Sequence, residues 1–463
     1  MPKTDQIAFD ALKKKTKLHF IGVGGVSMST LALIALRHGH TVSGYDRTRS
    51  PITEALSRQG IAVRYDSRPE AITGDMGVVY TAAIPESDPE LAAARALGIP
   101  CVPRAAYLGG VMLEYPVRVG VSGTHGKSTT TTMLATVFDA AGVDPTVACG
   151  AVMPRFGATH RIGGMDSRHF LYEACEYTDS FLSFHPTTAV ILNVELDHVD
   201  YFHSMEQLYD SFRRSAAEAE LLVICADDPG AVIAAEGFAG RLVTAGLREG
   251  DYTADNLRTE GFSQHFTLLR RGEPLTEVTL PLPGIHNLRN ALCAAAAAIE
   301  NGIAPEDVAA GFAALQGAKR RFERMGEVKG AILLDDYAHH PGEITATLRA
   351  ARAVLPEGGR LLVVFQPHTY SRTAGLMDDF AAALSLADRV VLAPIFAARE
   401  KNTYGVSSKT LAEKINGAVA LAGFPEIADW MEANARQGDI VITMGAGTIR
   451  DAAELLLKKY EKK

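Results

Sequence analysis

The sequence predicts an α/β protein made of three consecutive domains, and three observations support this fold class. The chain has 463 residues, whereas one domain usually holds about 100 to 200 residues. Hydrophobic residues make up 47% and charged residues 22% of the chain, the balance of ordinary globular proteins. Short β-branched runs alternate with amphipathic stretches, as in parallel sheets covered by helices. We expect domains at residues 1–113, 114–322 and 323–463.

The first domain is expected to contain four strands connected by helices. Strand-like runs begin at residues 17, 41, 61 and 76, in KLHFIGVGG, TVSGYD, IAVRYD and MGVVYTAA. The intervening stretches MSTLALIALRHGH and ITEALSRQG are amphipathic, as helices on a sheet are. The sequence GGVMLEYPV contains turn residues around positions 110 to 116, and we place the first boundary there.

The second and third domains repeat this alternation. In the second domain, VRVGV, FLYEA, TAVILNV and AELLVICAD read as strands, and NLRNALCAAAAAIENG reads as a helix that ends on glycine. Residues 251–281 alternate apolar and polar side chains, as antiparallel strands do. In the third domain, AILLDDYA, RLLVVFQP, RVVLAPI and DIVITMGAG read as strands separated by helical stretches.

Composition excludes several classes of function. A formal net charge of -8 argues against non-specific binding to nucleic acid, which requires a basic surface. Five cysteines without a C-x-x-C pair read as reduced thiols. The first twenty residues lack the continuous apolar segment of a signal peptide, and the most apolar run, ALCAAAAAI, is too short to span a bilayer. We therefore expect a cytoplasmic protein with no nucleic-acid or membrane partner.

The stretch GTHGKST has the context of a phosphate-binding loop. It lies between the strand-like VRVGV and the helix-like TTTMLATVFDAAG, although Gly123 is closer to Gly126 than in the commonest P-loops. Backbone N–H groups and the helix N-terminus would attract phosphate. Lys127 would reach the β- and γ-phosphates and the hydroxyl of Ser128 would bind Mg²⁺. The alternative is a glycine-rich turn with threonines as helix caps.

An incomplete dinucleotide fingerprint follows the first predicted strand. Gly22 and Gly24 of IGVGGVSMS match its first two glycines, but Ser27 stands at the third position. Asp46, after the second strand, would suit a ribose hydroxyl. The alternative is a tight turn that binds no ligand.

Further polar groups follow later strands, where the ligand crevice of a doubly wound sheet lies. Glu173 and His198, in LYEACEYTDSFL and ILNVELDHVDYF, could complete the coordination of a metal ion, although His198 alone would more often be structural. DDYAHHPGE and FQPHTYSRT offer groups that bind carboxylates and amines, and Arg372 suits a carboxylate through its bidentate fork.

These motifs together resemble the Mur ligases, the ATP-dependent amide-forming enzymes of peptidoglycan synthesis. The resemblance covers the whole chain and keeps the family's order: FIGVGGVSMSTLA, GTHGKSTTT, EACEYTDSFL, NVELDHVDYF, LPLPGIHNLRNALCAA, KRRFE, DDYAHHPGEI, FQPHTYSRT and GAGTIRD. It also accounts for the short glycine spacing. It implies a Rossmann-like N-terminal domain for a UDP-sugar, a central P-loop-type ATPase-like domain and a Rossmann-like C-terminal domain for an amino acid.

The resemblance further implies a reaction. ATP, with Mg²⁺, would convert the lactyl carboxylate of UDP-N-acetylmuramate into an acyl phosphate, and L-alanine would displace the phosphate to form an amide. The implied catalytic residues are Lys127, His198, Arg321 and His339. The implied ATP contacts are Gly123, Thr124, His125, Gly126, Lys127, Ser128, Thr129, Asn287, Asn290, Arg321 and Asp336, and the implied magnesium ligands are Ser128, Glu173 and His198. The implied substrate contacts are Gly22, Gly24, Gly25, Asp46, Tyr337, His340 and Arg372. Some relatives carry Arg where this chain has Thr369, so Arg372 would hold the incoming carboxylate alone.

Several alternatives remain open at this stage. The amino-acid substrate could be glycine, serine or a recycled tripeptide. A P-loop switch or transport ATPase would hydrolyse ATP without an acceptor, and a dehydrogenase would bind NAD(H) at IGVGG. The base that deprotonates the amine could be His198, His339 or His340. We expect a monomer or a weak homodimer.

Overall fold

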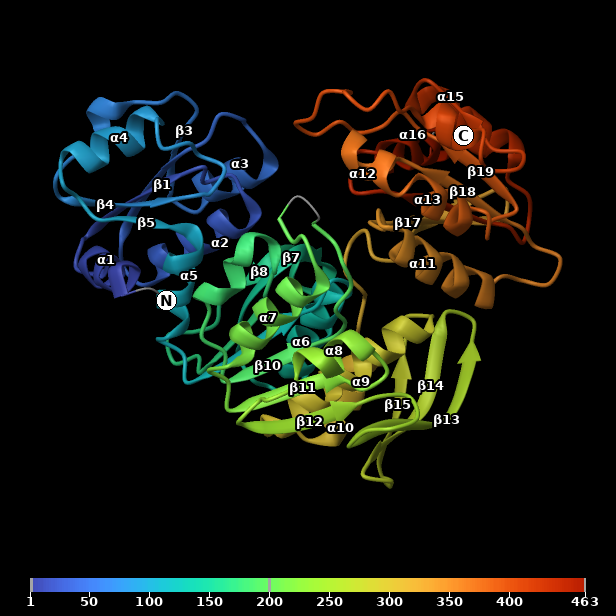
Figure 1. The fold of residues 1–463 in the computed structure, drawn as a ribbon, viewed down its shortest axis with the longest axis horizontal. Helices are drawn as coiled ribbons and strands as arrows, with labels where there is room; N and C mark the ends of the chain where they lie inside the picture. Colours follow the sequence, from blue (N-terminus) through green and yellow to red (C-terminus); the bar gives the residue numbers. More distant parts are fainter. Residues whose placement is uncertain (1–2, 199–200, 462–463) are drawn as a thin grey trace. The chain divides into compact units, whose positions relative to one another are not determined.

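The structure is a computed structural model that describes residues 3–198 and 201–461. Three β-sheets follow one another along the chain, coloured blue, green to yellow, and orange to red in Figure 1. The residues form two compact units. The first unit comprises residues 1–254, 268–276 and 289–314, and the second comprises residues 255–267, 277–288 and 315–463. The α/β class with three sheet domains is confirmed, while the domain boundaries at residues 113 and 322 stay predictions.

The first sheet is entirely parallel, with strand order β3-β2-β1-β4-β5. Strand β1 is the central strand, and its residues Leu18, Phe20 and Ile21 are almost fully buried. The predicted strands at 17, 41, 61 and 76 are all present. The elements are α1 (Lys3–Lys13), β1 (Lys17–Ile21), α2 (Val26–Arg37), β2 (Thr41–Tyr45), α3 (Pro51–Arg58), β3 (Ala62–Arg64), η1 (Pro69–Ala71), β4 (Met76–Tyr80), α4 (Pro89–Ala96), β5 (Cys101–Pro103) and α5 (Arg104–Met112).

The expected turn around residues 110 to 116 is wrong for its first residues, because α5 continues through Met112. The glycines there serve close packing rather than a turn. A Cβ atom on Gly110 would overlap the ring of Phe9 in α1, and one on Gly109 would overlap the carbonyl of Ser183. Small residues therefore let α5 approach its neighbours on two sides.

The second sheet has ten strands in the order β15-β14-β13-β12-β11-β10-β6-β9-β7-β8. Strand β6 is parallel to both of its neighbours, β10 and β9. The β7–β8 hairpin has no counterpart in the sequence-based expectation. The elements are β6 (Val117–Ser122), α6 (Lys127–Ala140), β7 (Thr146–Met153), η2 (Pro154–Phe156), β8 (Ala158–Arg161), β9 (His169–Glu173), η3 (Tyr177–Ser183), β10 (Thr188–Ile191), α7 (Met205–Ala216), β11 (Leu221–Cys225), α8 (Pro229–Ala234), β12 (Arg241–Ala245), β13 (Tyr252–Glu260), β14 (Ser263–Arg270), β15 (Glu273–Leu280), α9 (Ile285–Glu300) and α10 (Pro305–Ala313).

Helix α6 is buried over most of its length. Every residue from Ser128 to Phe138 is buried, including five threonines. Thr132 and Thr136 satisfy their hydroxyl groups by donating to backbone carbonyls one turn earlier, at 2.8 Å. The helix that follows the phosphate-loop motif is therefore part of the hydrophobic core.

The third sheet has the order β16-β17-β21-β18-β19-β20 and is parallel except for the β16–β17 pair. No helix among residues 3–198 and 201–461 is both long and apolar enough to cross a membrane. The elements are β16 (Glu323–Val328), β17 (Ala331–Asp336), α11 (Pro341–Ala353), β18 (Leu361–Phe365), α12 (Tyr370–Gly375), α13 (Met377–Leu384), β19 (Arg389–Leu392), α14 (Ser408–Ala412), β20 (Val419–Ala420), α15 (Phe424–Asn434), β21 (Ile440–Met444) and α16 (Arg450–Glu461).

Candidate active site

The GTHGKST motif forms a loop between β6 and α6. Gly123 and Gly126 have φ angles of +140° and +84°, a region that favours glycine. Gly126 caps the N-terminus of α6, so that Lys127 is the first helical residue. A Cβ atom on Gly126 would lie 2.8 Å from the side-chain amide of Asn290. Asn290, a predicted ATP contact, therefore packs directly against this loop.

Lys127 is held inside the loop by three groups. Its Nζ donates to the carbonyl oxygens of Gly123 and Thr124, at 2.5 and 3.0 Å, and to the Glu176 carboxylate at 2.9 Å. The side chains of Lys127 and Glu176 are 12% and 2% exposed. Burial alone would lower the pKa of Lys127, but the charge of Glu176 outweighs it and raises the pKa overall. Lys127 is therefore a charged ammonium group at neutral pH.

The predicted magnesium ligands Ser128 and Glu173 lie together. The Ser128 hydroxyl donates to Glu173 Oε2 at 2.8 Å, and the Gly150 N–H donates to the same oxygen at 2.8 Å. A hydroxyl and a carboxylate oxygen at hydrogen-bonding distance fit the oxygen ligands that Mg²⁺ prefers.

His198, the third predicted magnesium ligand, lies beside Glu176. Its Nε2 is 3.9 Å from Glu176 Oε1, and its ring packs against Tyr177 with centroids 4.5 Å apart. A φ angle of 53° places His198 in the left-handed region. The structure thus brings His198 to the Lys127–Glu176 pair, while Val199 and Asp200 of the same motif lie outside the described residues.

Two residues that the sequence-based site omits position this loop. Asn193, just after β10, accepts from the N–H of His125 at 2.7 Å and donates to its carbonyl at 3.0 Å. Glu176 holds Lys127, as described above. Both residues lie within the motifs NVELDH and EACEY, so their positions were visible in the sequence, but their contacts with the loop were not.

The glycine loop after β1 is held in place by a side chain of the same sheet domain. Gly22 has a φ angle of +83°, and the Gly24 N–H donates to Asp46 Oδ2 at 2.9 Å. The other Asp46 oxygen accepts from the Thr48 N–H at 3.0 Å. In the structure, Asp46 therefore shapes the backbone on which a ligand would rest. Gly25 caps the N-terminus of α2.

Arg104 is a further cation at this glycine loop, which the sequence-based prediction missed. It begins α5 and its Nη1 donates to the Ser27 hydroxyl at 3.2 Å. Ser27 stands at the third fingerprint position. Burial lowers the pKa of Arg104, although an arginine stays charged at neutral pH. A partly buried cation beside a glycine loop and a helix N-terminus suits a phosphate-bearing ligand.

In the second unit, His339, His340 and Arg321 gather around Glu343. The Glu343 carboxylate accepts from the backbone N–H groups of His339 and His340, at 3.0 and 3.3 Å, and lies 3.8 Å from Arg321. The guanidinium of Arg321 lies over the ring of Tyr337, 5.1 Å from its centroid. Glu343, a residue absent from the predicted site, thus connects Arg321 with both histidines.

His368 adds a neutral imidazole to this group. Its ring stacks on Phe396 with centroids 5.5 Å apart and lies 6.0 Å from the ring of His339. Burial first, and then the charges of His339 and Arg372, lower the pKa of His368 to about 4. Its Nδ1 is buried without a hydrogen-bond partner among the described residues. Such a nitrogen has an open capacity for a polar ligand.

Asp336 and Asn287 are bonded to nearby groups of the second unit. Both Asp336 oxygens accept backbone N–H bonds, from Phe322 at 2.7 Å and from Ala338 at 2.8 Å. Burial raises the pKa of Asp336 to about 6. The Asn287 side chain donates to the Pro283 carbonyl at 2.7 Å. Their predicted contacts with ATP stay predictions.

Comparison with known proteins gives consistent matches along the chain. Residues 17–116 match the Mur ligase family, catalytic domain, residues 121–298 match the Mur ligase middle domain, and residues 320–447 match the Mur ligase, glutamate ligase domain. The chain is 43% identical to a UDP-N-acetylmuramate–L-alanine ligase of Agathobacter rectalis, over 96% of this chain and 98% of that protein. It is 42% identical to the ligase of the same name from Acetivibrio thermocellus, over 98% of each chain.

Solved structures show the same arrangement of elements. A UDP-N-acetylmuramate–alanine ligase of Thermotoga maritima aligns with a TM-score of 0.81 at 26% identity, covering 96% of this chain and 99% of that one. A murein peptide ligase of Psychrobacter arcticus, at 23% identity and a TM-score of 0.70, shares the fold. With full-length relatives above 40% identity and a matching model for each sheet domain, the chain belongs to the Mur ligase family.

Proposed function

We propose that this enzyme joins L-alanine to the lactyl carboxylate of UDP-N-acetylmuramate, with conversion of ATP to ADP and phosphate, in peptidoglycan precursor synthesis. The observation that carries this proposal is the phosphate loop with its buried Lys127, in a chain whose full-length relatives bear the name of this ligase. The enzyme would act in the cytoplasm, as a monomer or weak homodimer, without a nucleic-acid or membrane partner.

Activation of the carboxylate is the task of the first unit. A carboxylate is a poor acyl donor, so its oxygen first attacks the γ-phosphate of ATP and forms an acyl phosphate. Lys127 supplies a fixed positive charge where negative charge develops in that transition state. Ser128 and Glu173 would hold Mg²⁺, which neutralises phosphate charge when bound.

The UDP-sugar would lie on the glycine loop after β1. Gly22 and Gly24 leave the backbone accessible, and the N-terminus of α2 and the guanidinium of Arg104 favour an anionic diphosphate. Asp46 holds the loop in shape rather than depending on a ligand for its own hydrogen bonds.

Amide formation requires an unprotonated amine, and the cluster around Glu343 would bind the amino acid. Arg372 would pair with the carboxylate of L-alanine. His368, with a pKa of about 4, is too weakly basic to deprotonate an ammonium group at neutral pH. We therefore assign the role of base to His198, His339 or His340, with His339 favoured within the second unit because Glu343 orients it at 3.1 Å.

Phosphate release tests the proposal directly. The enzyme is incubated with ATP, Mg²⁺ and UDP-N-acetylmuramate, and with L-alanine, glycine, L-serine or a tripeptide in parallel reactions. We expect sustained phosphate release with L-alanine only when all substrates are present. Equal release with ATP alone would indicate a simple ATPase, and faster release with the tripeptide would indicate a recycling ligase.

A further inference from the structure

A pocket separate from the candidate active site lies at the N-terminal end of the strands of the first sheet. Its volume is about 630 Å³, and its walls come from α1, the turn after α2, the end of α5 and residues 162–167. The glycine loop Gly22–Gly25 follows the C-terminal end of β1, whereas the pocket residues 37–40 precede β2, which is parallel to β1. The pocket therefore lies at the N-terminal ends of the strands, whereas the loop proposed for the UDP-sugar lies at their C-terminal ends.

The pocket is also remote from the phosphate loop. It lies where strands β6 and β9 begin, whereas the groups expected to bind ATP lie where these strands end. Glu114 and Tyr115 directly precede β6, which leads into Gly123, and residues 162–167 precede β9, which ends at Glu173. The groups that would bind ATP are therefore separate from this pocket. The ATP-binding role proposed for those groups does not explain the pocket.

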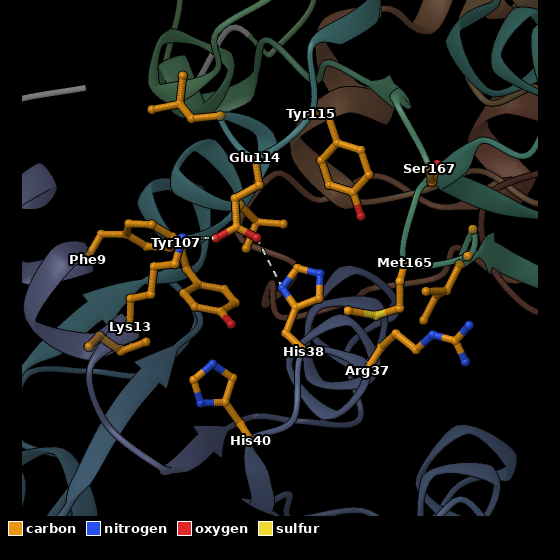
Figure 2. A pocket seen from close by; sticks show the side chains of 16 residues that line it. Phe9, Lys13, Arg37, His38, His40, Tyr107, Glu114, Tyr115, Met165 and Ser167 are labelled. Carbon is orange, nitrogen blue, oxygen red and sulfur yellow. Dashed lines mark ion pairs between the residues drawn. The ribbon is translucent and has the colours of Figure 1, made fainter.

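The charges in the pocket favour an anion. Glu114 supplies the one carboxylate among the described residues that line it, and this carboxylate pairs with Lys13 and, at 3.1 Å, with His38. Figure 2 shows Glu114 between these two side chains. Burial would raise the pKa of Glu114, but His38 and Lys13 lower it overall. Asp144, just behind the lining, is close enough to Arg37 to interact with its charge, but it already pairs with Arg161 at 2.6 Å. Because Lys13 balances Glu114 and Arg161 balances Asp144, Arg37 gives the lining a surplus positive charge.

His40 and Tyr107 provide hydrogen-bonding groups near this charge. His40 Nδ1 lies 2.8 Å from the Lys15 carbonyl, which can only accept, so Nδ1 carries the proton. Tyr107 is 3% exposed, and burial raises the pKa of its hydroxyl. It therefore remains a neutral donor. Figure 2 shows its hydroxyl directed toward the rings of His38 and His40.

The remaining walls are apolar. The rings of Phe9 and Tyr107 pack with centroids 5.7 Å apart, and both residues are almost fully buried. Met165 is 72% exposed at the rim, where Figure 2 shows it extending next to Arg37 and His38. A flexible thioether can adapt to an apolar group that enters the pocket. Pockets of about 300 to 1,000 Å³ are typical of small organic ligands, and this one offers polar and apolar side chains in similar measure.

We propose that this pocket binds a small organic anion, whose carboxylate or phosphate group pairs with Arg37 and whose apolar body packs against Phe9, Tyr107 and Met165. This site is additional to the ligase reaction proposed above and does not rest on it.

Calorimetric titration of the full-length enzyme tests the site. The probes are 2-naphthoate and 2-naphthyl phosphate, with neutral 2-naphthamide and inorganic phosphate as comparisons, all in excess Mg-ADP to fill the nucleotide site. We expect both naphthyl anions to bind with one-to-one stoichiometry and the amide and inorganic phosphate to bind at least about tenfold more weakly. The tighter of the two anions identifies whether the natural ligand carries a carboxylate or a phosphate.

Three variants separate this pocket from other anion sites. Arg37→Gln should weaken the naphthyl anions about tenfold, and Met165→Glu should weaken them through like-charge repulsion. The matched control is Arg58→Gln, because Arg58 is also exposed and also ends a helix of the first sheet domain. Thermal melting checks that each variant is folded.

Met165 also serves as a local reporter. In enzyme labelled with ¹³C-methyl methionine, its resonance, assigned with Met165→Leu, should shift on addition of 2-naphthoate. The proposal is overturned if the naphthyl anions do not bind, or if 2-naphthamide binds as tightly as they do. It is also overturned if Arg37→Gln and Arg58→Gln weaken binding equally, or if the Met165 resonance does not change.

Discussion

Replacing Glu176 with glutamine removes the negative charge that faces Lys127 while keeping the size of the side chain. Glu176 is 2% exposed and its carboxylate is 2.9 Å from Lys127 Nζ. After the change, Lys127 still donates to the carbonyls of Gly123 and Thr124. The variant therefore isolates the contribution of one buried charge at the phosphate loop.

The expected cost follows from the burial of the pair. Removing one partner of a buried ion pair costs about 3 to 5 kcal/mol, and the remaining carbonyl contacts place this case near the lower end, at about 3 kcal/mol. For a domain of about 150 to 250 residues this loss lowers Tm by roughly 6 to 12 °C. Differential scanning fluorimetry measures it.

Nucleotide should relieve about half of this loss. In the wild type, a phosphate group that pairs with Lys127 must compete with Glu176, whereas in Glu176→Gln the phosphate supplies the missing charge. We expect Mg-ADP to raise Tm more in the variant than in the wild type, equivalent to about tenfold tighter apparent binding.

A matched control is Glu218→Gln, which removes an exposed carboxylate that pairs with His185 at 2.6 Å. It should change stability by less than about 0.5 kcal/mol. The reasoning is refuted if Glu176→Gln melts like the wild type, or if its loss of stability persists unchanged in saturating Mg-ADP.

Three further predictions concern other parts of the two units. Lys127→Ala should lower kcat/KM by at least about a hundredfold, because about 3 kcal/mol of transition-state stabilisation is lost. The surface variant Lys17→Ala should leave kcat/KM unchanged. A tenfold effect or less at Lys127 would contradict its role. Gly126→Ala should cost about 2 kcal/mol or more, because its Cβ would meet Asn290 at a φ of +84°; Gly142→Ala, with a φ of +72° and open space, should cost less in urea denaturation. Burial raises the pKa of Asp336 from 3.8 to about 6, so the folded state keeps a proton that the unfolded state has lost. The stability of the second unit should therefore fall by about 3 kcal/mol as pH rises from about 4 to about 6, and no further above that range. Asp336→Asn should flatten this part of the profile, and an unchanged slope would assign it to other groups.

The sequence predicted those features that depend on local pattern. Consecutive residues are enough to recognise the buried strands of the three sheets, the glycines of the phosphate loop and the helix that follows this loop. The structure contains all three features. The glycine pair at 109 and 110 misled the turn prediction, since the same residues serve a turn or a close helix contact.

Other parts of the site depend on contacts between distant residues. Glu176 is 49 residues from Lys127 in the chain, and Asn193 is 68 residues from His125. No periodicity or spacing rule joins such pairs, because the sheet order that brings them together is a property of the folded chain. Arg104 and Glu343 were missed for the same reason, since their significance lies in the loops that they contact.

The burial of α6 has a consequence for how the enzyme fails under stress. Because residues 128–138 are enclosed on every side, the N-terminal turn that presents Lys127 and Ser128 has little freedom to open alone. The amide hydrogens of this helix should exchange with solvent only when the whole surrounding domain unfolds. Heat or denaturant would then abolish nucleotide binding and the core together, so that partly damaged molecules do not persist as folded proteins with an impaired phosphate loop.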